Sequence, residues 1–222
     1  GVLSLSFIYG ALFNVYNYKI RKVKVKLMKL PAAFNGLKVV QISDIHSGSL
    51  TDKNAVQKAV DKINDLQPDL IFFTGDLVNY ASKEVEPYID ILKTIKSKTR
   101  VYSILGNHDY GTYMQWESDK EMQDNFMHLL ELQREKLGWD LLMDEHRILD
   151  RNGKKLAIIG VQYIGHSLRF GKFGDLKKAY AGAETADIQL LLSHDPSHWD
   201  HEVSLKEELF NWFRVCVIFL LF

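Results

Sequence analysis

The sequence contains very little cysteine, and this scarcity restricts the chemistry open to it. Its 222 residues include one cysteine, Cys216. A single cysteine excludes an internal disulfide framework and a metal site built from thiolates. Histidine, aspartate, glutamate and asparagine side chains must therefore supply any metal ligands.

The sequence also lacks an excess of charge of either sign. Lys and Arg total 28 and Asp and Glu total 28, so the formal net charge is zero. A neutral chain has no electrostatic reason to bind a polyanion, and nucleic acid is not expected as a partner. No internal repeat or low-complexity linker interrupts the sequence. The length and the 46% of hydrophobic residues fit one globular domain with a full core.

The first 16 residues contain no charged side chain, yet this run is shorter than the roughly 20 apolar residues of a spanning helix. Since the sequence begins with Gly1, one interpretation is the end of a membrane helix; a cleaved signal or a buried helix are the alternatives. We favour the membrane helix, over residues 1–17, because a basic run follows it. That run contains Lys19, Arg21, Lys22, Lys24 and Lys26. Positive flanks mark the cytoplasmic side, so we expect a membrane-anchored protein with its main domain on that face.

The basic run also has a second interpretation. From Lys22 to Leu27 charged and apolar residues alternate, which is the period of a half-exposed strand. The cations would then be the solvated face of that strand. Both interpretations can hold together, and residues 18–36 are expected to form a basic strand or linker.

From residue 37 onward, short apolar runs alternate with amphipathic helices. Strands are expected in LKVVQIS, DLIFFTG and RVYSILG and at about residues 155–161 and 188–193. Helices are expected between them, with apolar faces over residues 56–66, 85–95 and 122–130. Strands that alternate with helices predict βαβ units and a mostly parallel sheet.

Four of the expected strands end in residues that bind metals or carry protons. These residues are Asp44, His46, Asp76, Asn107, His108 and His194. A turn explains each segment taken singly, because Gly, Asn and Asp are common where a chain reverses. It does not explain the whole set. Since open α/β sheets bind ligands beyond the carboxyl ends of their strands, a functional site at this edge is favoured.

The ordered set of motifs resembles the calcineurin-like metallophosphoesterases. The segments SDIH (43–46), TGDL (74–77), LGNHDYG (105–111) and LSHDP (192–196) follow the order of motifs in that family. The wider segments SDIHSG and SHDPSHW are similar to its bacterial membrane-linked branch. The resemblance spans roughly residues 37–200, which we take as the metallophosphoesterase domain. It implies an α/β fold, a four-layer sandwich of two mixed β-sheets flanked by helices.

The resemblance implies a metal-dependent phosphoester hydrolase with two divalent metal ions. Asp76 would bridge them, Asp44 and His46 would complete the protein ligands of one ion, and Asn107 and His194 would bind the other. Two metals can hold both the attacking and the leaving oxygen of a displacement at phosphorus. Carboxylate, imidazole and amide ligands suit Mn²⁺, Fe or Zn. Among these metals we expect Mn²⁺, with Fe or Zn as alternatives.

A hydroxide between the two metals would be the nucleophile of such a site. By the same resemblance, His108 would protonate the departing oxygen and Asp109 would orient His108. The expected substrate is a phosphorylated small molecule or a lipid-linked phosphoester. The alternative is a non-catalytic binding scaffold of the same fold, or an inactive fragment.

After residue 200 the sequence departs from the family pattern. The family continues with G-H-x-H, whose two histidines reach one metal each, whereas residues 201–222 read HEVSLKEELFNWFRVCVIFLLF. GHSL at 165–168 ends in Leu168 and precedes His194, so it is not the counterpart. We therefore expect a domain that is incomplete at its C-terminal end and a divergent tail that closes neither sheet nor site. The remaining histidines are expected at the surface or in loops: His128, His146, His198 and His201. Trp199 is expected to line the substrate entrance.

Overall fold

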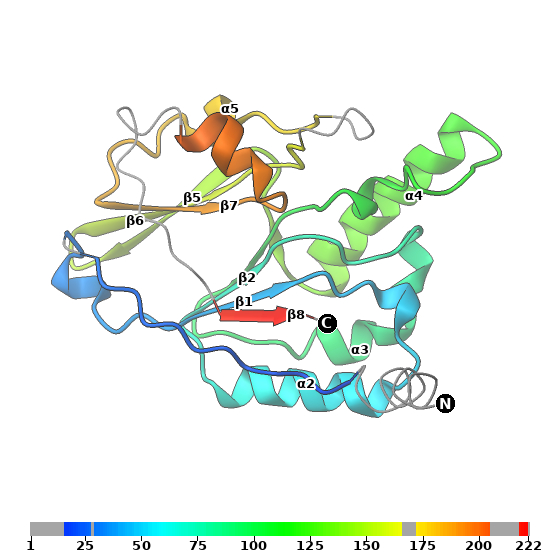
Figure 1. Ribbon diagram of the computed structural model, residues 1–222, viewed down its shortest axis with the longest axis horizontal. Helices are drawn as coiled ribbons and strands as arrows, with labels where there is room; N and C mark the ends of the chain where they lie inside the picture. Colours follow the sequence, from blue (N-terminus) through cyan, green and yellow to red (C-terminus); the bar gives the residue numbers. More distant parts are fainter. Residues whose placement is uncertain (1–15, 28, 166–171, 205–217, 222) are drawn as a thin grey trace, which may run out of the picture.

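The structure is a computed structural model that describes residues 16–27, 29–165, 172–204 and 218–221 (Figure 1). The described helices are α2 (Lys53–Asp65), α3 (Ile89–Leu92), α4 (Asp119–Glu131) and α5 (Leu176–Tyr180). The described strands are β1 (Val39–Ser43), β2 (Leu70–Phe73), β3 (Val101–Ser103), β4 (Asp140–Leu141), β5 (Glu145–Arg151), β6 (Lys154–Gly160), β7 (Ile188–Leu192) and β8 (Ile218–Leu221).

The strands form two sheets. The larger has the order β4-β3-β2-β1-β8, and all its described pairs are parallel. The smaller has the order β5-β6-β7, in which β5 is antiparallel and β7 parallel to β6. The expectation of mixed sheets therefore holds for the smaller sheet, while the described pairs of the larger one are uniformly parallel.

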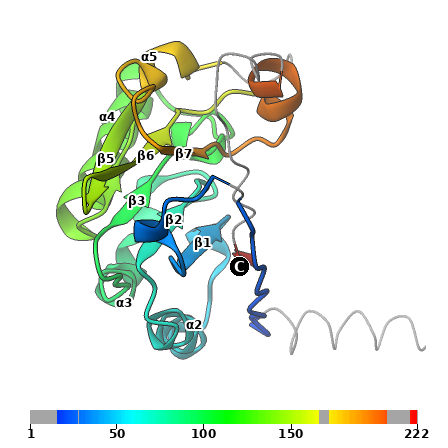
Figure 2. The same ribbon diagram turned by 90° about the vertical axis from the view of Figure 1, so that its left-hand side faces the viewer.

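The two sheets and their helices make four layers, which Figures 1 and 2 show from two sides. Buried side chains such as Phe72 on β2 and Ile158 on β6 fill the space between the sheets. Helices α2 and α3 cover the outer face of the larger sheet, and α5 covers the outer face of the smaller one. The predicted four-layer α/β sandwich is confirmed.

Helix α2 illustrates how local sequence sets these layers. The side chain of Asp52 caps the helix by accepting hydrogen bonds from the backbone N–H groups of Asn54 and Ala55, at 2.8 and 3.1 Å. The residues of one face are fully buried against the larger sheet: Val56, Ala59, Val60 and Ile63. The spacing of three and four residues that predicted this helix is the spacing that packs.

The structure bears on two expectations for the ends of the chain. Residues 22–27 are not part of a strand, so of the two forms expected for residues 18–36 the linker remains a prediction. At the other end, β8 pairs in parallel with β1, with Val40 opposite Ile218. The expectation that the tail closes no sheet therefore fails for residues 218–221.

The described residues contain no helix that is long and apolar enough to cross a membrane. The expected membrane segment, residues 1–17, lies almost entirely outside the described residues. So do three of the four residues of GHSL, since residues 166–171 are not described.

Candidate metal centre

The site is built where the loops after β1 and β2 run side by side. The backbone N–H of Asp44 donates to the carbonyl of Gly75 at 3.0 Å, and that of His46 donates to the carbonyl of Asp76 at 3.1 Å. Asp44, His46 and Asp76 have φ angles of 56°, 45° and 60°. These left-handed conformations are unfavourable for residues with a side chain, and such strain is concentrated at functional sites. The backbone thus points these three side chains inward at a conformational cost.

Two glycines allow the loop after β3 to join this pair. A Cβ atom on Gly106 would overlap the carboxylate of Asp76, and one on Gly75 would overlap the backbone of Gly106. Only glycine permits so close an approach. These glycines therefore do more than turn the chain, because they let three loops meet around one carboxylate.

The carboxylate of Asp76 lies at the centre of the cluster. Its Oδ2 is 3.5 Å from Nε2 of His46 and 3.4 Å from Nε2 of His194, while its Oδ1 accepts a hydrogen bond from the backbone N–H of His108 at 2.9 Å. One oxygen therefore lies between two imidazole nitrogens that come from different strands. This is the arrangement expected of a carboxylate that is shared by two cations.

The structure groups the possible ligand atoms into two overlapping sets, each with its atoms within 4.8 Å of one another. One set is His46, Asp76 and His108, and the other is Asp44, Asp76 and His194. Asp76 belongs to both, which is compatible with the predicted bridge, but the sets separate Asp44 from His46, which the sequence analysis assigned to the same ion. The first set also brings His108 close enough to be a ligand, which the sequence did not indicate.

Exposure varies across the cluster and shows where a substrate can approach. The side chains of Asp44 and His46 are 36% and 29% exposed, whereas those of His194 and Asp76 are 10% and 4% exposed. The site is therefore open on the β1 side and closed on the β7 side.

His194 is held with one ring nitrogen toward the cluster. Its Nδ1 lies 2.8 Å from the carbonyl of Thr74, and its Nε2 lies 3.1 Å from Oδ1 of Asn107. Because a carbonyl can only accept, Nδ1 carries a proton and Nε2 faces the site, as in histidines that bind metals. Asn107 and His194 therefore meet as the sequence predicted.

The charges of Asp76 and His194 support each other. Burial would lower the pKa of His194, but the hydrogen bond and charge of Asp76 raise this pKa to about 9. Burial would likewise raise the pKa of Asp76, but His194 lowers it on balance. Each group thus favours the charged form of the other, and a divalent cation would compete with a proton for Nε2 of His194.

His108 is oriented by different groups from the one that the sequence indicated. Its Nδ1 lies 2.7 Å from the carbonyl of Asn79, and its ring stacks on Tyr113 with centroids 4.0 Å apart. The ring also meets His46 edge to face at 4.8 Å. The expected contact from Asp109 is replaced by the Asn79 carbonyl.

Asp109 instead connects the loops that follow β2 and β3. Its buried carboxylate accepts hydrogen bonds from four backbone N–H groups, those of Asp76, Leu77, Val78 and Gly106, at 2.8 to 3.3 Å. Burial and the charge of Asp76 raise its pKa to about 7, against the lowering effect of these amide hydrogen bonds. Asp109 therefore fixes the geometry of the loops and does not touch the His108 ring.

The other histidines of the described residues belong to neither set of possible metal ligands. His198 is fully buried, contrary to the expected loop position, and its Nδ1 lies 2.9 Å from Oγ of Ser193. His128 contacts Ser82, and His146 lies on β5 beside the carbonyl of Ala179. Trp199 packs against the core that α5 covers.

The sequence did not indicate Tyr113 or Asn79. Tyr113 stacks on His108, and its hydroxyl accepts a hydrogen bond from Nδ2 of Asn107. Asn79 contributes a backbone carbonyl, which leaves no mark in the side-chain pattern. A tyrosine six residues beyond a predicted ligand carries no signal of its own, because only the fold of the loop brings it back.

Comparisons with known proteins agree with this geometry. Residues 37–220 match the family described as Calcineurin-like phosphoesterase. The chain is 28% identical over 194 residues to a transmembrane protein with metallophosphoesterase domain from Danio rerio, covering 85% of this chain and 42% of that protein. It is 36% identical over 97 residues to the UDP-2,3-diacylglucosamine pyrophosphatase LpxG of Chlamydia trachomatis, covering 43% of this chain and 30% of that protein.

The chain spans less than half the length of the curated relatives that it matches over most of its own length. Among solved structures, TT1561 of Thermus thermophilus has the same fold, with a TM-score of 0.50 at 12% identity, covering 83% of this chain and 88% of that one. Because the family match covers most of the sequence, the chain belongs to the calcineurin-like phosphoesterase family, whose members are hydrolases that act on phosphoester bonds and use divalent metals.

Proposed function

We propose that this protein hydrolyses phosphoesters at a dinuclear metal centre bridged by Asp76. The observation that carries the proposal is the position of Oδ2 of Asp76, within 3.5 Å of imidazole nitrogens of both His46 and His194. Asp44 and His46 would complete the protein ligands of one ion, and Asn107 and His194 those of the other. The donors are oxygen and nitrogen atoms without a thiolate, so Mn²⁺ is the proposed metal, with Fe or Zn as alternatives.

When bound, two such ions supply a hydroxide nucleophile and neutralise charge on the phosphoryl group. The chain's own residues donate a proton and position the loops of the site. His108 contacts the partly exposed His46 and would give a proton to the departing oxygen, while the Asn79 carbonyl holds its Nδ1. Asp109 keeps the loops that carry Asp76 and His108 in register.

The proposed substrate is a phosphorylated small molecule or a lipid-linked phosphoester. The relative from Chlamydia trachomatis carries the name of a pyrophosphatase that acts on UDP-2,3-diacylglucosamine, and this supports the second class. For the rest of the chain, we propose that residues 1–17 end a membrane helix and that residues 18–36 link it to the domain at 37–200. The basic run supports a catalytic domain on the cytoplasmic face.

Two substitutions test the assignment of roles. Asp76→Asn removes the shared negative ligand, so we expect it to lose tightly bound Mn²⁺ and to abolish hydrolysis of an aryl phosphodiester with the fold intact. His108→Ala should retain most of the metal while turnover falls by a factor on the order of 10² to 10⁴, the usual range for a positioned acid. Metal content by mass spectrometry, turnover and circular dichroism are measured on the same samples.

A buried carboxylate away from the cluster provides the matched control. Asp144 is buried and accepts from the backbone N–H of Gln162 at 3.0 Å, so Asp144→Asn tests the general cost of such a change. Wild-type turnover in Asp76→Asn would refute the bridge. Equal metal loss in His108→Ala would make His108 a ligand, and metal binding without turnover in the wild type would favour a binding scaffold.

A further inference from the structure

The first described stretch of the chain is a basic surface. Between Tyr16 and Gly36 every charged residue is a cation. All six cations are exposed, and together they define the basic segment: Lys19, Arg21, Lys22, Lys24, Lys26 and Lys29. Since the whole chain is neutral, the rest of the protein carries a matching net negative charge. The positive charge is therefore concentrated in one segment.

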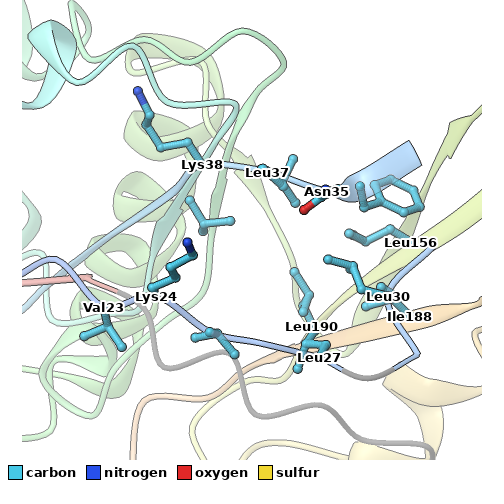
Figure 3. Close-up of a pocket in the computed structure, with 14 residues that line it drawn as sticks. Val23, Lys24, Leu27, Leu30, Asn35, Leu37, Lys38, Leu156, Ile188 and Leu190 are labelled. Carbon is cyan, nitrogen blue, oxygen red and sulfur yellow. The ribbon is translucent and has the colours of Figure 1, made fainter. Parts of the chain in front are cut away.

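An apolar cavity of about 350 Å³ lies beside the basic segment. This volume lies within the range of small-molecule pockets. Figure 3 shows Leu27, Leu30, Leu156 and Leu190 around the cavity, with Lys24 at its margin. Its apolar wall consists of Val23, Val25, Leu27, Leu30, Phe34, Leu37, Val39, Leu156, Ile188 and Leu190.

The cavity is separate from the metal centre. It lies at the beginnings of β1 and β7, which contribute Val39 and Ile188, whereas the metal centre lies at the ends of the same strands. At about 3.3 Å per residue, the length of β1 places them roughly 15 Å apart. The cavity is therefore a separate site from the metal centre, at the opposite end of these strands.

We propose that the cavity and the basic segment bind one anionic phospholipid of a membrane surface. An acyl chain fills the apolar cavity, and the headgroup phosphate lies against Lys22 and Lys24. The other cation of the lining, Lys38, directs its Nζ to the carbonyl of Leu66 at 2.7 Å, which leaves Lys24 as the cation at the margin.

Charge and shape together select this ligand. Basic residues attract any polyanion, but a nucleic acid or a free phosphate has no apolar part to enter the cavity. A neutral lipid would fill the cavity but gain nothing from the cations. An anionic lipid uses both, and the interleaving of Val23 and Val25 with Lys22 and Lys24 presents the two features together.

The binding test uses short-chain lipids below their micelle concentration, so that a membrane anchor does not dominate. Isothermal titration of the full chain with dihexanoyl phosphatidylglycerol should show saturable binding. Dihexanoyl phosphatidylcholine, which lacks the net charge, should bind at least tenfold more weakly, and glycerol 3-phosphate, which lacks the chains, should not bind. Equal affinity for phosphatidylglycerol and glycerol 3-phosphate would reduce the site to an anion patch.

Variants then separate headgroup from chain. Lys22→Glu combined with Lys24→Glu should weaken phosphatidylglycerol binding by a factor on the order of 10 to 100, given the usual contribution of each basic residue. The matched pair Lys177→Glu and Lys178→Glu, exposed on α5, should not change it. An equal effect of both pairs would show that overall charge alone is responsible.

Leu27→Asn tests the cavity wall, with Met127→Asn on the exposed face of α4 as its control. Leu27→Asn should weaken binding of both lipids. If it leaves them unchanged, or if a short duplex DNA binds the wild type more tightly than the lipid does, the proposal is overturned. Turnover and metal content should be unaffected by every variant, so this proposal and the metal centre can fail separately.

Discussion

At the residue scale, the sequence indicated the possible metal ligands but not the contacts of the residues that position them. Asp44 and Asp76 follow neighbouring parallel strands of the larger sheet, whose carboxyl ends lie at one edge, so the sequence predicted their meeting. His194 follows β7 of the smaller sheet, so it reaches the cluster only because the two sheets pack face to face. Asp109 was expected to orient His108, because a motif gives the order of residues and not how deeply each one is buried. Its burial under four amide groups depends on how three loops pack.

Tyr113 is the residue whose substitution separates two roles in the site. Its hydroxyl holds Nδ2 of Asn107, which turns Oδ1 of that amide toward His194, and its ring stacks on His108. Tyr113→Phe keeps the stack and loses the hydroxyl. We expect it to weaken metal binding about 10 to 100-fold, the usual cost of losing such a partner, with a smaller effect on kcat at saturating metal.

Tyr113→Leu loses the stack as well, so kcat should fall further than in Tyr113→Phe at saturating metal. Metal titrations and steady-state kinetics on both variants give the split between affinity and kcat. Tyr102→Phe, whose ring lies in the core between the sheets, is the control and should change neither quantity. Identical kinetics and metal affinity in Tyr113→Phe and wild type would show that the Tyr113 hydroxyl does not position Asn107.

At the scale of elements, periodicity predicted β1, β2 and β3 of the larger sheet and the helices α2 and α4, but it missed β4 and β8 of the same sheet. The helix expected over residues 85–95 is instead two 3-10 turns, Ser82–Glu84 and Glu86–Tyr88, followed by the short α3. Pro87 has no N–H to donate and interrupts a regular helix there. Strand β5 was missed because most of its residues are polar.

The turn between β5 and β6 carried a signal for that strand. Asn152 and Gly153 both have positive φ, at 55° and 74°, as a two-residue hairpin turn requires. An Asn-Gly pair between two runs of alternating polarity is a strong hairpin signal. It would have predicted β5, and with it the antiparallel edge of the smaller sheet.

Asp69 joins the beginnings of three strands and gives a prediction about pH. Its carboxylate accepts from the backbone N–H of Lys38 at 2.7 Å and from Nζ of Lys98 at 3.0 Å. Burial would raise its pKa, but these hydrogen bonds lower it on balance. Because its pKa is lower in the folded protein, Asp69 stabilises the fold above its unfolded pKa of about 4, and this is lost as pH falls through the folded value.

We therefore expect Asp69→Asn to lower the free energy of unfolding by about 1 kcal/mol at pH 7, with the difference shrinking at pH 3. Urea denaturation of wild type and variant at both pH values measures it. Asp65→Asn, at the exposed end of α2, should change the free energy by less than about 0.5 kcal/mol. A difference for Asp69→Asn that is the same at both pH values would show that its charge contributes nothing.

At the scale of the whole molecule, the two proposed sites lie at opposite ends of the same strands. The metal centre lies beyond the carboxyl ends of β1, β2 and β7, and the basic segment borders the beginnings of β1 and β7. If the basic segment rests on a bilayer, the metal centre lies roughly 15 Å farther from that surface, at the other end of the strands. A lipid-linked substrate would therefore have to extend its phosphoester beyond the bilayer surface to reach the metal centre.

The proposed membrane anchor and the same charges give a prediction about orientation. Basic residues within about 15 to 20 residues of a membrane segment are retained in the cytoplasm, so we expect residues from 18 onward to lie there. In the full-length protein, a fluorescent protein fused after Leu37 should be fluorescent, and alkaline phosphatase, which folds only outside, should be inactive. Lys22→Glu combined with Lys24→Glu should reduce the preference for the cytoplasmic side. The matched pair Lys177→Glu and Lys178→Glu, tested with the reporter fused at the C-terminus, should leave this preference intact. The reason is that α5 lies far along the chain from the apolar run. Active alkaline phosphatase after Leu37 would reverse the orientation and with it the assignment of the basic segment to the cytoplasmic leaflet.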